Sequence, residues 1–509
     1  MPGTPPSEAR LVTASMMRDL VVCERRPWLD VHGDPAERAP VAPFVELLWR
    51  GGMAHEDAVL AALPGAIADL RETAPADRVA ATLAAISGDA DHILGGELRH
   101  EDLLGRPDVL SRHDGHWYAG DVKSGTPFMP DGQRPKMEYC AQVGFYAYML
   151  GQLGIGDLSR AFVIGRGGEL TWYDLAAPAR GGTLAQRVAE LLARARAIVH
   201  KRAETRGAAG AFCGLCHWRD TCAAELAAAD DLTLLAGMGR SLRALVEPFA
   251  ANRQQLAALD VARLRTERGE CAVPGLGMAR LERFRDRALL AVTPGAAAYA
   301  REPLDLPLYP REWHLDIEAD PTAGPLVYLH GVWERVGSPG AWTERYVPFF
   351  ADGDDGERQA FAEVWALLTS DEAAAIYYYS PYERTSYRML QRRYPDVCAE
   401  DEVEELFASP RVVDLYGDVV APHTDWPLQS YGLKAIAKSQ GFRWNAADAG
   451  GASSIAWYDE WRRTGDPAML ERIIDYNRSD VIASAVVLDA LRALPVRATG
   501  PLSASPALF

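Results

Sequence analysis

Cysteine is scarce in this sequence, with seven residues among 509. So few thiols in so long a chain cannot form the dense disulfide framework of a small secreted domain. Long apolar runs are also missing, since no stretch approaches the ~20 residues that a membrane-spanning helix needs. The first ten residues are polar and proline-rich, so we expect no secretory signal and a soluble, cytoplasmic protein.

Positive charge is in short supply as well. Lysine and arginine total 53 against 70 aspartates and glutamates, which gives a formal net charge of −17. This balance is unfavourable for a protein that binds nucleic acid, because such proteins usually neutralise phosphates with basic side chains. Clusters of metal-binding carboxylates would account for part of the acidic excess, and net charge does not describe local patches. The length predicts more than one domain, at ~100–200 residues each.

A predicted β-hairpin organises the first half of the chain. Two short apolar runs flank a polar, glycine-containing turn at residues 111–115. The hairpin places Asp108 on one strand and Asp121 and Lys123 on the next, where residues i and i+2 share a face. Two carboxylates beside a lysine fit a divalent cation held by oxygen ligands. A single Asp-x-Lys is more often a solvated surface pair, so the hypothesis depends on the rest of the pattern.

Further polar residues follow and precede this hairpin in a fixed order. Gln142 and Tyr146 lie one turn apart on one face of a predicted helix, and His55 lies in a helical pattern upstream. The whole set resembles the RecB-like branch of the PD-(D/E)xK nucleases: His55, Asp108, Asp121-x-Lys123 and Gln142-x-x-x-Tyr146. The resemblance implies a metal held by His55, Asp108 and Asp121, with Lys123 positioning the attacking hydroxide or neutralising the transition state.

Four of the seven cysteines form a second pattern. Cys213, Cys216 and Cys222 have the spacing C-x2-C-x5-C, and Cys23 lies in a predicted helix at residues 12–31. Four thiolates suffice for one metal centre, although a zinc ribbon more often shows two close pairs. The pattern resembles the iron–sulfur staple of RecB-like nucleases from CRISPR adaptation and from bacterial helicase–nucleases, which implies a [4Fe–4S] cluster that ties the ends of the domain together. Zinc and unligated thiols are the alternatives.

The middle segment, residues 226–305, has a different character. It contains Gly237-x-Gly239 and Gly275-x-Gly277, each at the start of an apolar-periodic helix. These resemble helix–hairpin–helix elements, which hold a phosphate backbone through glycine amides and a helix N-terminus. The same elements also serve as plain structural connectors, and both readings stay open.

The second half begins with a predicted strand that carries Asp316 and Glu318 on one face. Two more strands follow it in meander order, and helices come later, which suggests an RNase H-like sheet. Tyr476 and Asp480 lie one turn apart on a late helix. This set resembles the DEDDy class of 3′→5′ exonucleases, in which four acids hold two divalent cations and the tyrosine orients the attacking water.

The fourth acid departs from the family pattern. The family usually has aspartate in its second motif, whereas this chain has Glu383 just after a predicted strand at residues 375–380. Asp414, on a separate predicted strand, is the other candidate. We favour Glu383, because it follows the strand at the family's offset and its longer side chain could span a small backbone displacement.

These patterns predict an α/β protein with four segments: a RecB-like nuclease domain with an iron–sulfur cluster (1–225), a helix–hairpin–helix-like connector (226–305), an RNase H-like exonuclease domain (306–495) and a tail (496–509). We expect a Mg²⁺- or Mn²⁺-dependent nuclease acting on DNA in repair or defence. A scaffold with one or both sites inactive, and an RNA-processing exonuclease, are the alternatives. The chain has no Gly-Lys-Thr/Ser phosphate loop, so any unwinding would need a helicase partner.

Overall fold

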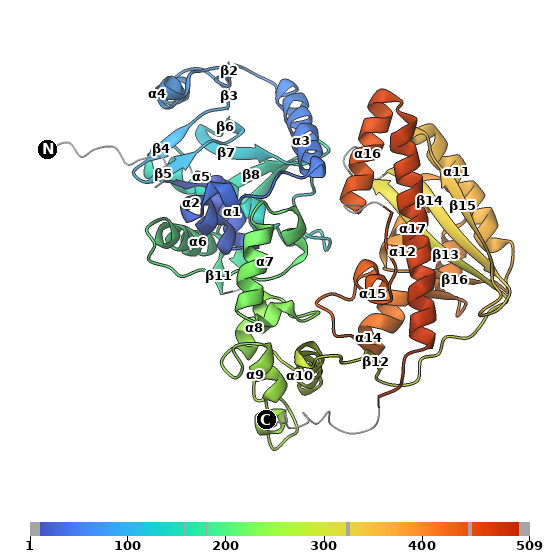
Figure 1. Cartoon of the computed structure of the whole chain (residues 1–509). Helices are drawn as coiled ribbons and strands as arrows, with labels where there is room; N and C mark the ends of the chain where they lie inside the picture. Colours follow the sequence, from blue (N-terminus) through green and yellow to red (C-terminus); the bar gives the residue numbers. More distant parts are fainter. Residues whose placement is uncertain (1–10, 157, 180, 322–325, 446–449, 498–509) are drawn as a thin grey trace. The chain divides into compact units, whose positions relative to one another are not determined.

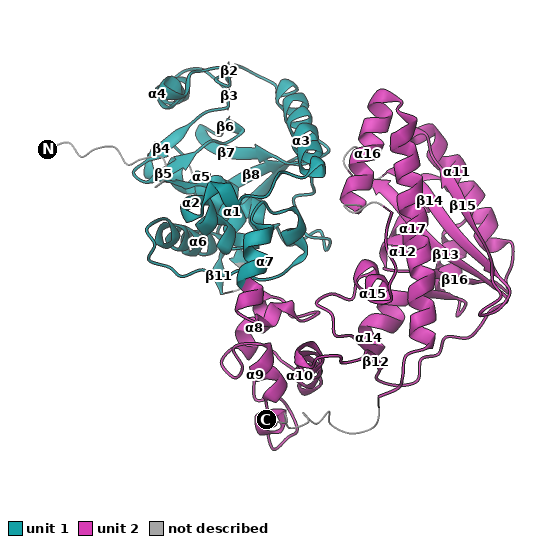
Figure 2. Ribbon diagram, viewed as in Figure 1, with its two compact units in different colours: residues 1–225 teal, residues 226–509 magenta. Residues whose placement is uncertain are grey.

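The computed structural model describes residues 11–156, 158–179, 181–321, 326–445 and 450–497 (Figure 1). The chain divides into two compact units between Glu225 and Leu226 (Figure 2). Each unit has its own hydrophobic cores and is described by itself below. The predicted tail lies outside the described residues from residue 498 onward.

A six-stranded sheet in the order β2-β3-β6-β7-β8-β9 forms the centre of unit 1. Its strands are β2 Ile67–Asp69, β3 His92–Leu94, β6 Val109–His113, β7 His116–Val122, β8 Arg160–Ile164 and β9 Leu170–Asp174. Strands β6 and β7 form the predicted hairpin, but its turn consists of Asp114 and Gly115 alone. Both residues have positive φ, at 51° and 81°, which suits a tight two-residue turn between twisted strands. Residues 111–113 therefore belong to β6, and the prediction of a longer turn was wrong.

Helices cover both faces of this sheet. They are α1 Ala14–Val22, α2 Arg25–His32, α3 Pro43–Ala61, α4 Pro75–Ile86, α5 Met137–Gln152, α6 Leu184–Val199 and α7 Arg219–Ala228. Trp117 and Ala119 of β7 pack in one core with α1, α5 and α6, while Tyr118 packs with Leu60 of α3. This alternation follows from the two-residue period of a strand. Two short sheets complete the unit. One consists of β1 Val12–Thr13, β5 Leu103–Gly105 and β4 Leu98–His100, and the other of β10 Pro178–Ala179 and β11 Gly182–Thr183.

The predicted helix at residues 12–31 is two helices. Thr13 caps the first, with its hydroxyl accepting the backbone N–H of Met16 at 3.3 Å. Cys23 ends it in an extended conformation, with φ −157° and ψ 118°, and α2 begins two residues later. The break places Cys23 in an irregular segment between helices rather than on a helix face.

A five-stranded sheet in the order β15-β14-β13-β16-β17 forms the centre of unit 2. Its strands are β13 Arg311–Asp320, β14 Leu326–Val336, β15 Thr343–Phe350, β16 Ala375–Tyr378 and β17 Val412–Asp414. The first three are antiparallel neighbours, as the predicted meander requires, and β16 and β17 run parallel to β13. The helices around this sheet are α11 Gly353–Thr369, α12 Tyr382–Arg393, α13 Glu400–Ala408, α14 Ala421–His423, α15 Leu433–Ser439, α16 Gly451–Thr464 and α17 Pro467–Arg492.

The two faces of β13 have opposite character. Trp313, Leu315 and Ile317 pack in an apolar core with side chains of α11, α12 and α13. Asp316 and Glu318 alternate with them, so they point to the other face, where α17 contacts β13 and β14. The strand therefore presents two carboxylates to a helix that carries further polar side chains.

The middle segment belongs to unit 2. Its helices are α8 Arg240–Val246, α9 Arg253–Ala258 and α10 Met278–Val292, and they share a small apolar core. Gly237 and Gly275 have positive φ, at 79° and 81°. Gly239 and Gly277 are the N-cap residues of α8 and α10. The segment before β13 contains the short strand β12 Tyr299–Ala300, which pairs with β18 Thr424–Asp425.

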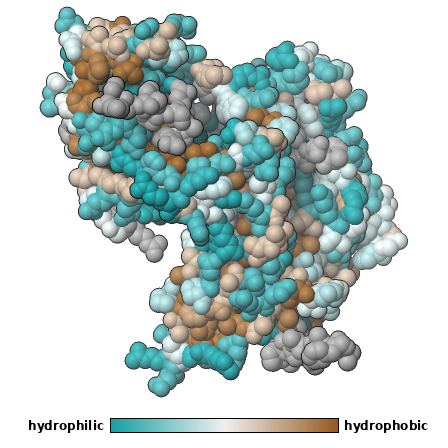
Figure 3. All heavy atoms as spheres, turned by 60° about the vertical axis from the view of Figure 1, so that its left-hand side comes forward, coloured by the Kyte–Doolittle hydropathy of each residue, from teal (hydrophilic) through white to brown (hydrophobic). Residues whose placement is uncertain are grey.

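No helix among the described residues is long and apolar enough to cross a membrane. Several large apolar side chains are exposed, and among the described residues Met53 and Phe212 are the most exposed of them, at 61% and 72%. Hydrophilic and hydrophobic side chains are interspersed over the face that Figure 3 shows.

Candidate functional site

The end of β7 brings together the three residues that the hairpin predicted. Lys123 donates from Nζ to Oδ2 of Asp121 at 3.0 Å, and Oδ2 of Asp108 accepts the backbone N–H of Val122 at 2.8 Å. Asp121 is fully buried. Burial, followed by the charge of Asp121, raises the pKa of Asp108 well above its usual value. A bound cation would relieve this repulsion, but Asp108 and Asp121 belong to no group of three possible ligands within 4.8 Å among the described residues.

Helix α3 adds a third carboxylate that the sequence reasoning missed. Burial and the negative charge of Asp121 raise the pKa of Glu56, and Glu56 in turn adds to the raised pKa of Asp108. His55 precedes it, and its Nε2 is buried with no hydrogen-bond partner among the described residues. A buried imidazole nitrogen without a partner is costly and suits a metal ligand.

Helix α5 places Gln142 and Tyr146 beside the same group. The Tyr146 hydroxyl donates to the carbonyl of Arg106 at 2.9 Å and is hydrogen-bonded to Gln142. Burial and the charges of Asp121 and Asp108 raise the pKa of Tyr146. The Gln142 Oε1 atom is buried without a partner in the described part of the chain.

A second group of acids lies between β13 and α17. One carboxylate oxygen from each of Asp316, Glu318 and Asp480 lies within 4.8 Å of the others. Burial, and then the charge of Asp480, raises the pKa of Glu318 to about 8. The pKa of Asp316 is raised by the same two causes in the same order. Three carboxylates that crowd each other in a buried site are the arrangement that divalent cations neutralise.

Three side chains hold Asp480 in place. Trp444 donates from Nε1 to its Oδ1 at 2.6 Å, and the Tyr476 hydroxyl is hydrogen-bonded to the same carboxylate. The Lys434 ammonium lies 4.6 Å from the centre of the Tyr476 ring, and its positive charge lowers the pKa values of Asp480 and Glu318. Tyr476 itself is buried.

Asn477 of α17 holds the other side of the group. Its Nδ2 donates to Oδ2 of Asp316 at 2.8 Å, and its Oδ1 accepts the hydroxyl of Tyr346 at 2.8 Å. Gly331 of β14 makes room for this contact, because a Cβ atom there would lie 1.6 Å from Asn477 Oδ1.

Glu383 lies in the first turn of α12 and is buried. The Ser380 hydroxyl donates to its Oε2 at 3.1 Å, and burial raises its pKa to about 8. Its charge contributes to the raised pKa of Asp316, although it is not among the three acids whose oxygens lie within 4.8 Å. Asp414 instead accepts two backbone N–H groups at the start of a π-helical turn, η6 Leu415–Val420, at 2.9 Å each. The assignment of Glu383, in preference to Asp414, as the fourth acid stays a prediction.

The four patterned cysteines line one cavity. Cys23 follows α1, Cys213 lies in the 3₁₀ turn η3 Ala211–Leu215, Cys216 follows that turn, and Cys222 lies in α7. All four are free thiols. Burial raises the pKa of Cys222 to about 12 and raises that of Cys216 as well. Among the described residues, no three of these sulfur atoms form a group within 4.8 Å.

Two family models match the chain. Residues 28–223 match the PD-(D/E)XK nuclease superfamily, and residues 313–492 match the RNase H superfamily. The chain carries two nuclease domains. Both are nuclease folds, so the expectation of a metal-dependent nuclease is confirmed at that level. No curated protein matches the chain.

The PD-(D/E)XK domain and the RNase H domain each hold one of the two acid groups. Sequence reasoning missed Glu56 in the first, and Lys434, Trp444 and Asn477 in the second. Glu56 could have been found beside His55, since both belong to one helical turn. Asn477 lies next to Tyr476 in the late motif, whereas nothing in the local pattern marks Trp444.

Proposed function

We propose that this chain hydrolyses phosphodiester bonds of DNA, in single strands or at ends, and that it acts in DNA repair or defence. The RNase H domain would supply a 3′→5′ exonuclease and the PD-(D/E)XK domain a second nuclease site. The observation that carries the proposal is the group of half-buried Asp316 and buried Glu318 and Asp480, whose oxygens lie within 4.8 Å of one another. Carboxylates this close are unfavourable unless cations or protons neutralise them.

In the RNase H domain, Asp316, Glu318, Glu383 and Asp480 would hold two cations, either Mg²⁺ or Mn²⁺. Such ions, when bound, activate water and stabilise the leaving oxygen. Asn477 fixes the rotamer of Asp316, and Trp444 fixes that of Asp480, so the ligands are already oriented. The hydroxyl of Tyr476 would orient the attacking water once a cation displaces its hydrogen bond to Asp480.

In the PD-(D/E)XK domain, Asp108, Asp121 and His55 would hold a cation, and we add Glu56 to this set. Lys123 keeps its proton, because the charges of Asp121 and Asp108 outweigh burial and raise its pKa. A lysine that stays charged beside two carboxylates would neutralise the charge that develops on the phosphate. Gln142 and Tyr146 would position the substrate strand or the ligands.

We propose that Cys23, Cys213, Cys216 and Cys222 hold a [4Fe–4S] cluster. The four thiols line one cavity, which is what a shared centre requires. We prefer this cluster to zinc because one remote cysteine with a C-x2-C-x5-C motif departs from the two close pairs that are typical of a zinc ribbon.

We propose that the middle helices contact the phosphate backbone as a helix–hairpin–helix element. The two Gly-x-Gly motifs have the same local form, with a left-handed first glycine and a second glycine that caps a helix. The N–H groups in the first turn of a helix have no acceptor within the helix, and such groups can bind phosphate oxygens. A helicase partner would supply single strands, because the chain has no phosphate loop of its own.

The test uses end-labelled single-stranded DNA, duplex DNA and single-stranded RNA with Mn²⁺. We expect the whole protein to shorten single-stranded DNA from its 3′ end, and Asp480→Asn to abolish this ladder while leaving any cuts made by the first site. Asp121→Asn should do the reverse. Preference for RNA would replace the DNA assignment, and no cleavage by protein that holds its cofactors would favour a nucleic-acid-binding scaffold.

A further inference from the structure

A cavity rich in arginine lies in unit 2, outside both acid groups. Arg280, Arg283 and Arg287 of α10 line it on one side, and Tyr431 and Gly432 line it on the other. The three arginines recur at i, i+3 and i+7, so they lie along one face of the helix. We call this cavity the arginine pocket. It concentrates positive charge in a chain whose net charge is −17.

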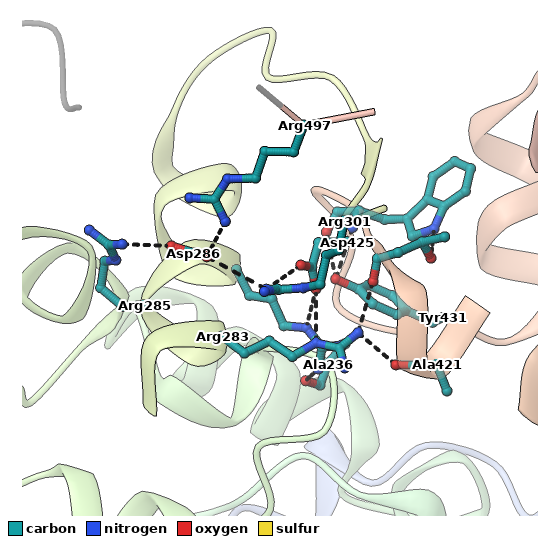
Figure 4. Close-up of polar contacts among 12 residues, drawn as sticks. Ala236, Arg283, Arg285, Asp286, Arg301, Ala421, Asp425, Tyr431 and Arg497 are labelled. Atoms are coloured by element: carbon teal, nitrogen blue, oxygen red, sulfur yellow. Dashed lines mark hydrogen bonds and ion pairs between the residues drawn. The ribbon is translucent and has the colours of Figure 1, made fainter. Parts of the chain in front are cut away.

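Two of these arginines are held rigidly. Arg283 donates from Nη2 to the carbonyls of Ala421 and Thr424, and from Nε to the buried Asp425 at 3.3 Å (Figure 4). Arg287 donates from Nε to Asp425 at 2.8 Å and from Nη1 to the carbonyl of Ala236 at 2.7 Å. Guanidinium groups fixed in this way are preorganised for a ligand.

Each of these two arginines has one amino group that is not used in the hydrogen bonds just described. In the described part of the chain, Arg283 Nη1 and Arg287 Nη2 donate to no protein acceptor, and neither is a buried orphan atom. Arg280 is exposed and forms no ion pair with any described residue. The pocket thus offers three guanidinium groups with unused donors, the chemistry that recognises phosphate oxygens.

The local charge is unbalanced. Asp425 is fully buried and is shared by Arg283, Arg287 and Arg301. Burial, and then the positive charge of Arg287, lowers the pKa of Arg283, as expected where cations outnumber carboxylates. An anion in the pocket would offset this excess.

The pocket is connected to the acids of the RNase H domain by a short stretch of chain. Gly432 lines the pocket, and Lys434, two residues later, faces Asp480. Two residues span at most ~7 Å. The Tyr379 hydroxyl also donates to the carbonyl of Tyr431, which lines the pocket, at 2.7 Å. Tyr379 directly follows β16, four residues before Glu383.

We propose that the arginine pocket binds a backbone phosphate of the nucleic-acid strand whose scissile bond lies at Asp316, Glu318 and Asp480. This inference rests on the proposed exonuclease and adds to it a subsite for a non-reacting phosphate. Binding energy from such a remote contact holds the strand in position for cleavage. The contact is electrostatic, so it carries no base preference.

The test compares Arg280→Ala with Arg268→Ala in full-length protein that also carries Asp121→Asn to silence the first site. Arg268 is an exposed arginine of the same segment that does not line the pocket, so it controls for lost charge. Arg280→Ala should raise the KM for a single-stranded oligonucleotide several-fold at unchanged kcat. Hydrolysis of thymidine 5′-(p-nitrophenyl phosphate), which has only the reacting phosphate, should not change. Arg280→Lys should keep most of the affinity, because it keeps the charge.

Binding gives an independent readout. Fluorescence anisotropy with a labelled oligonucleotide in Ca²⁺ measures the binding constant K as a function of salt concentration. In Arg280→Ala, the slope of log K against log salt should be smaller in magnitude by about 0.7, which is the change expected for the loss of one phosphate contact on a single strand. If Arg280→Ala matches Arg268→Ala in both assays, or if the small ester is affected equally, the subsite is wrong while the nuclease assignment stands. The parent protein could fail to cleave any substrate while Arg280→Ala still weakens binding and reduces the salt slope by this amount. In that case the exonuclease assignment fails and the phosphate site stands. A parent that neither binds nor cleaves overturns both.

Discussion

At the scale of single residues, Lys434 is the cation whose charge lowers the pKa values of the acids of the RNase H domain. Asp480 sits on α17 beside Asp316 and Glu318, and its charge raises their pKa values. Asp480→Asn removes a ligand and should lower exonuclease kcat by roughly 100-fold or more. Asp475→Asn is the matched control, because Asp475 is exposed on the same helix and pairs with Arg478 at its surface. Equal activity of the two variants would remove Asp480 from the metal site.

The raised pKa values also predict how stability depends on pH without metal. Glu318 and Glu383 titrate near 8 in the folded protein, against an ordinary value of 4.5. The folded state therefore binds more protons than the unfolded state between these limits, so stability falls as pH rises from about 4.5 to about 8. We expect the melting temperature of the RNase H domain in EDTA to drop across this window.

Divalent cations should reverse that trend. Protons and cations compete for the same carboxylates, so Mg²⁺ should raise the melting temperature more at pH 8 than at pH 5.5. The variant Glu318→Gln should be more stable than the parent at pH 8 in EDTA and should gain less from Mg²⁺. A melting temperature in EDTA that rises between pH 5 and 8 would contradict the raised pKa values.

At the scale of elements, the spacing between β14 and α17 is set by a missing side chain. Gly331 lies against Asn477, and a Cβ atom there would overlap its Oδ1. Gly331→Ala should push α17 away from the sheet, destabilise the domain by about 1–3 kcal/mol and reduce exonuclease activity. Gly451→Ala, which meets no atom within 4 Å, should leave both unchanged. Thermal melts and oligonucleotide cleavage would measure the two effects.

The cysteine cavity joins the irregular segment after α1 to the turn before α7. If it holds an iron–sulfur cluster, anaerobically purified protein should be brown, and Cys216→Ser should bleach it and lower the melting temperature of the PD-(D/E)XK domain, because ligand binding and folding are coupled. Cys271→Ser, in the middle segment, should keep the colour. Colourless protein with one tightly bound zinc ion would replace the cluster.

Sequence patterns predicted which strands and helices carry the candidate site residues better than they predicted where those strands and helices begin and end. Asp316, Glu318 and Asp480 were found because strand and helix periods place such residues on one face. The extent of β6 was missed, because the Asp-Gly pair sets a two-residue turn that overrides the polar residues before it. Trp444 was missed because its contact with Asp480 depends on how a loop folds back, which no local period encodes.

At the scale of the whole molecule, each unit has separate cores. Fragments 1–225 and 226–509 should therefore each fold when made alone, since each buries its own apolar side chains. The first should keep the activity that Asp121→Asn removes, and the second the activity that Asp480→Asn removes. Circular dichroism and the oligonucleotide assay check this, and a fragment that is unfolded when made alone would show that the units depend on each other.

The ion pair between Arg25 and Glu225 links positions 200 residues apart. A nearby contact, from the Trp218 indole to Asp30 at 2.8 Å, has almost the same separation. On the ribosome, α2 emerges long before its partners. At ~5–20 residues per second, the delay is roughly 10–40 seconds. During that interval the segment around Cys23 lacks its contacts with residues 213–225, so the PD-(D/E)XK domain can complete its fold only after synthesis passes residue 225.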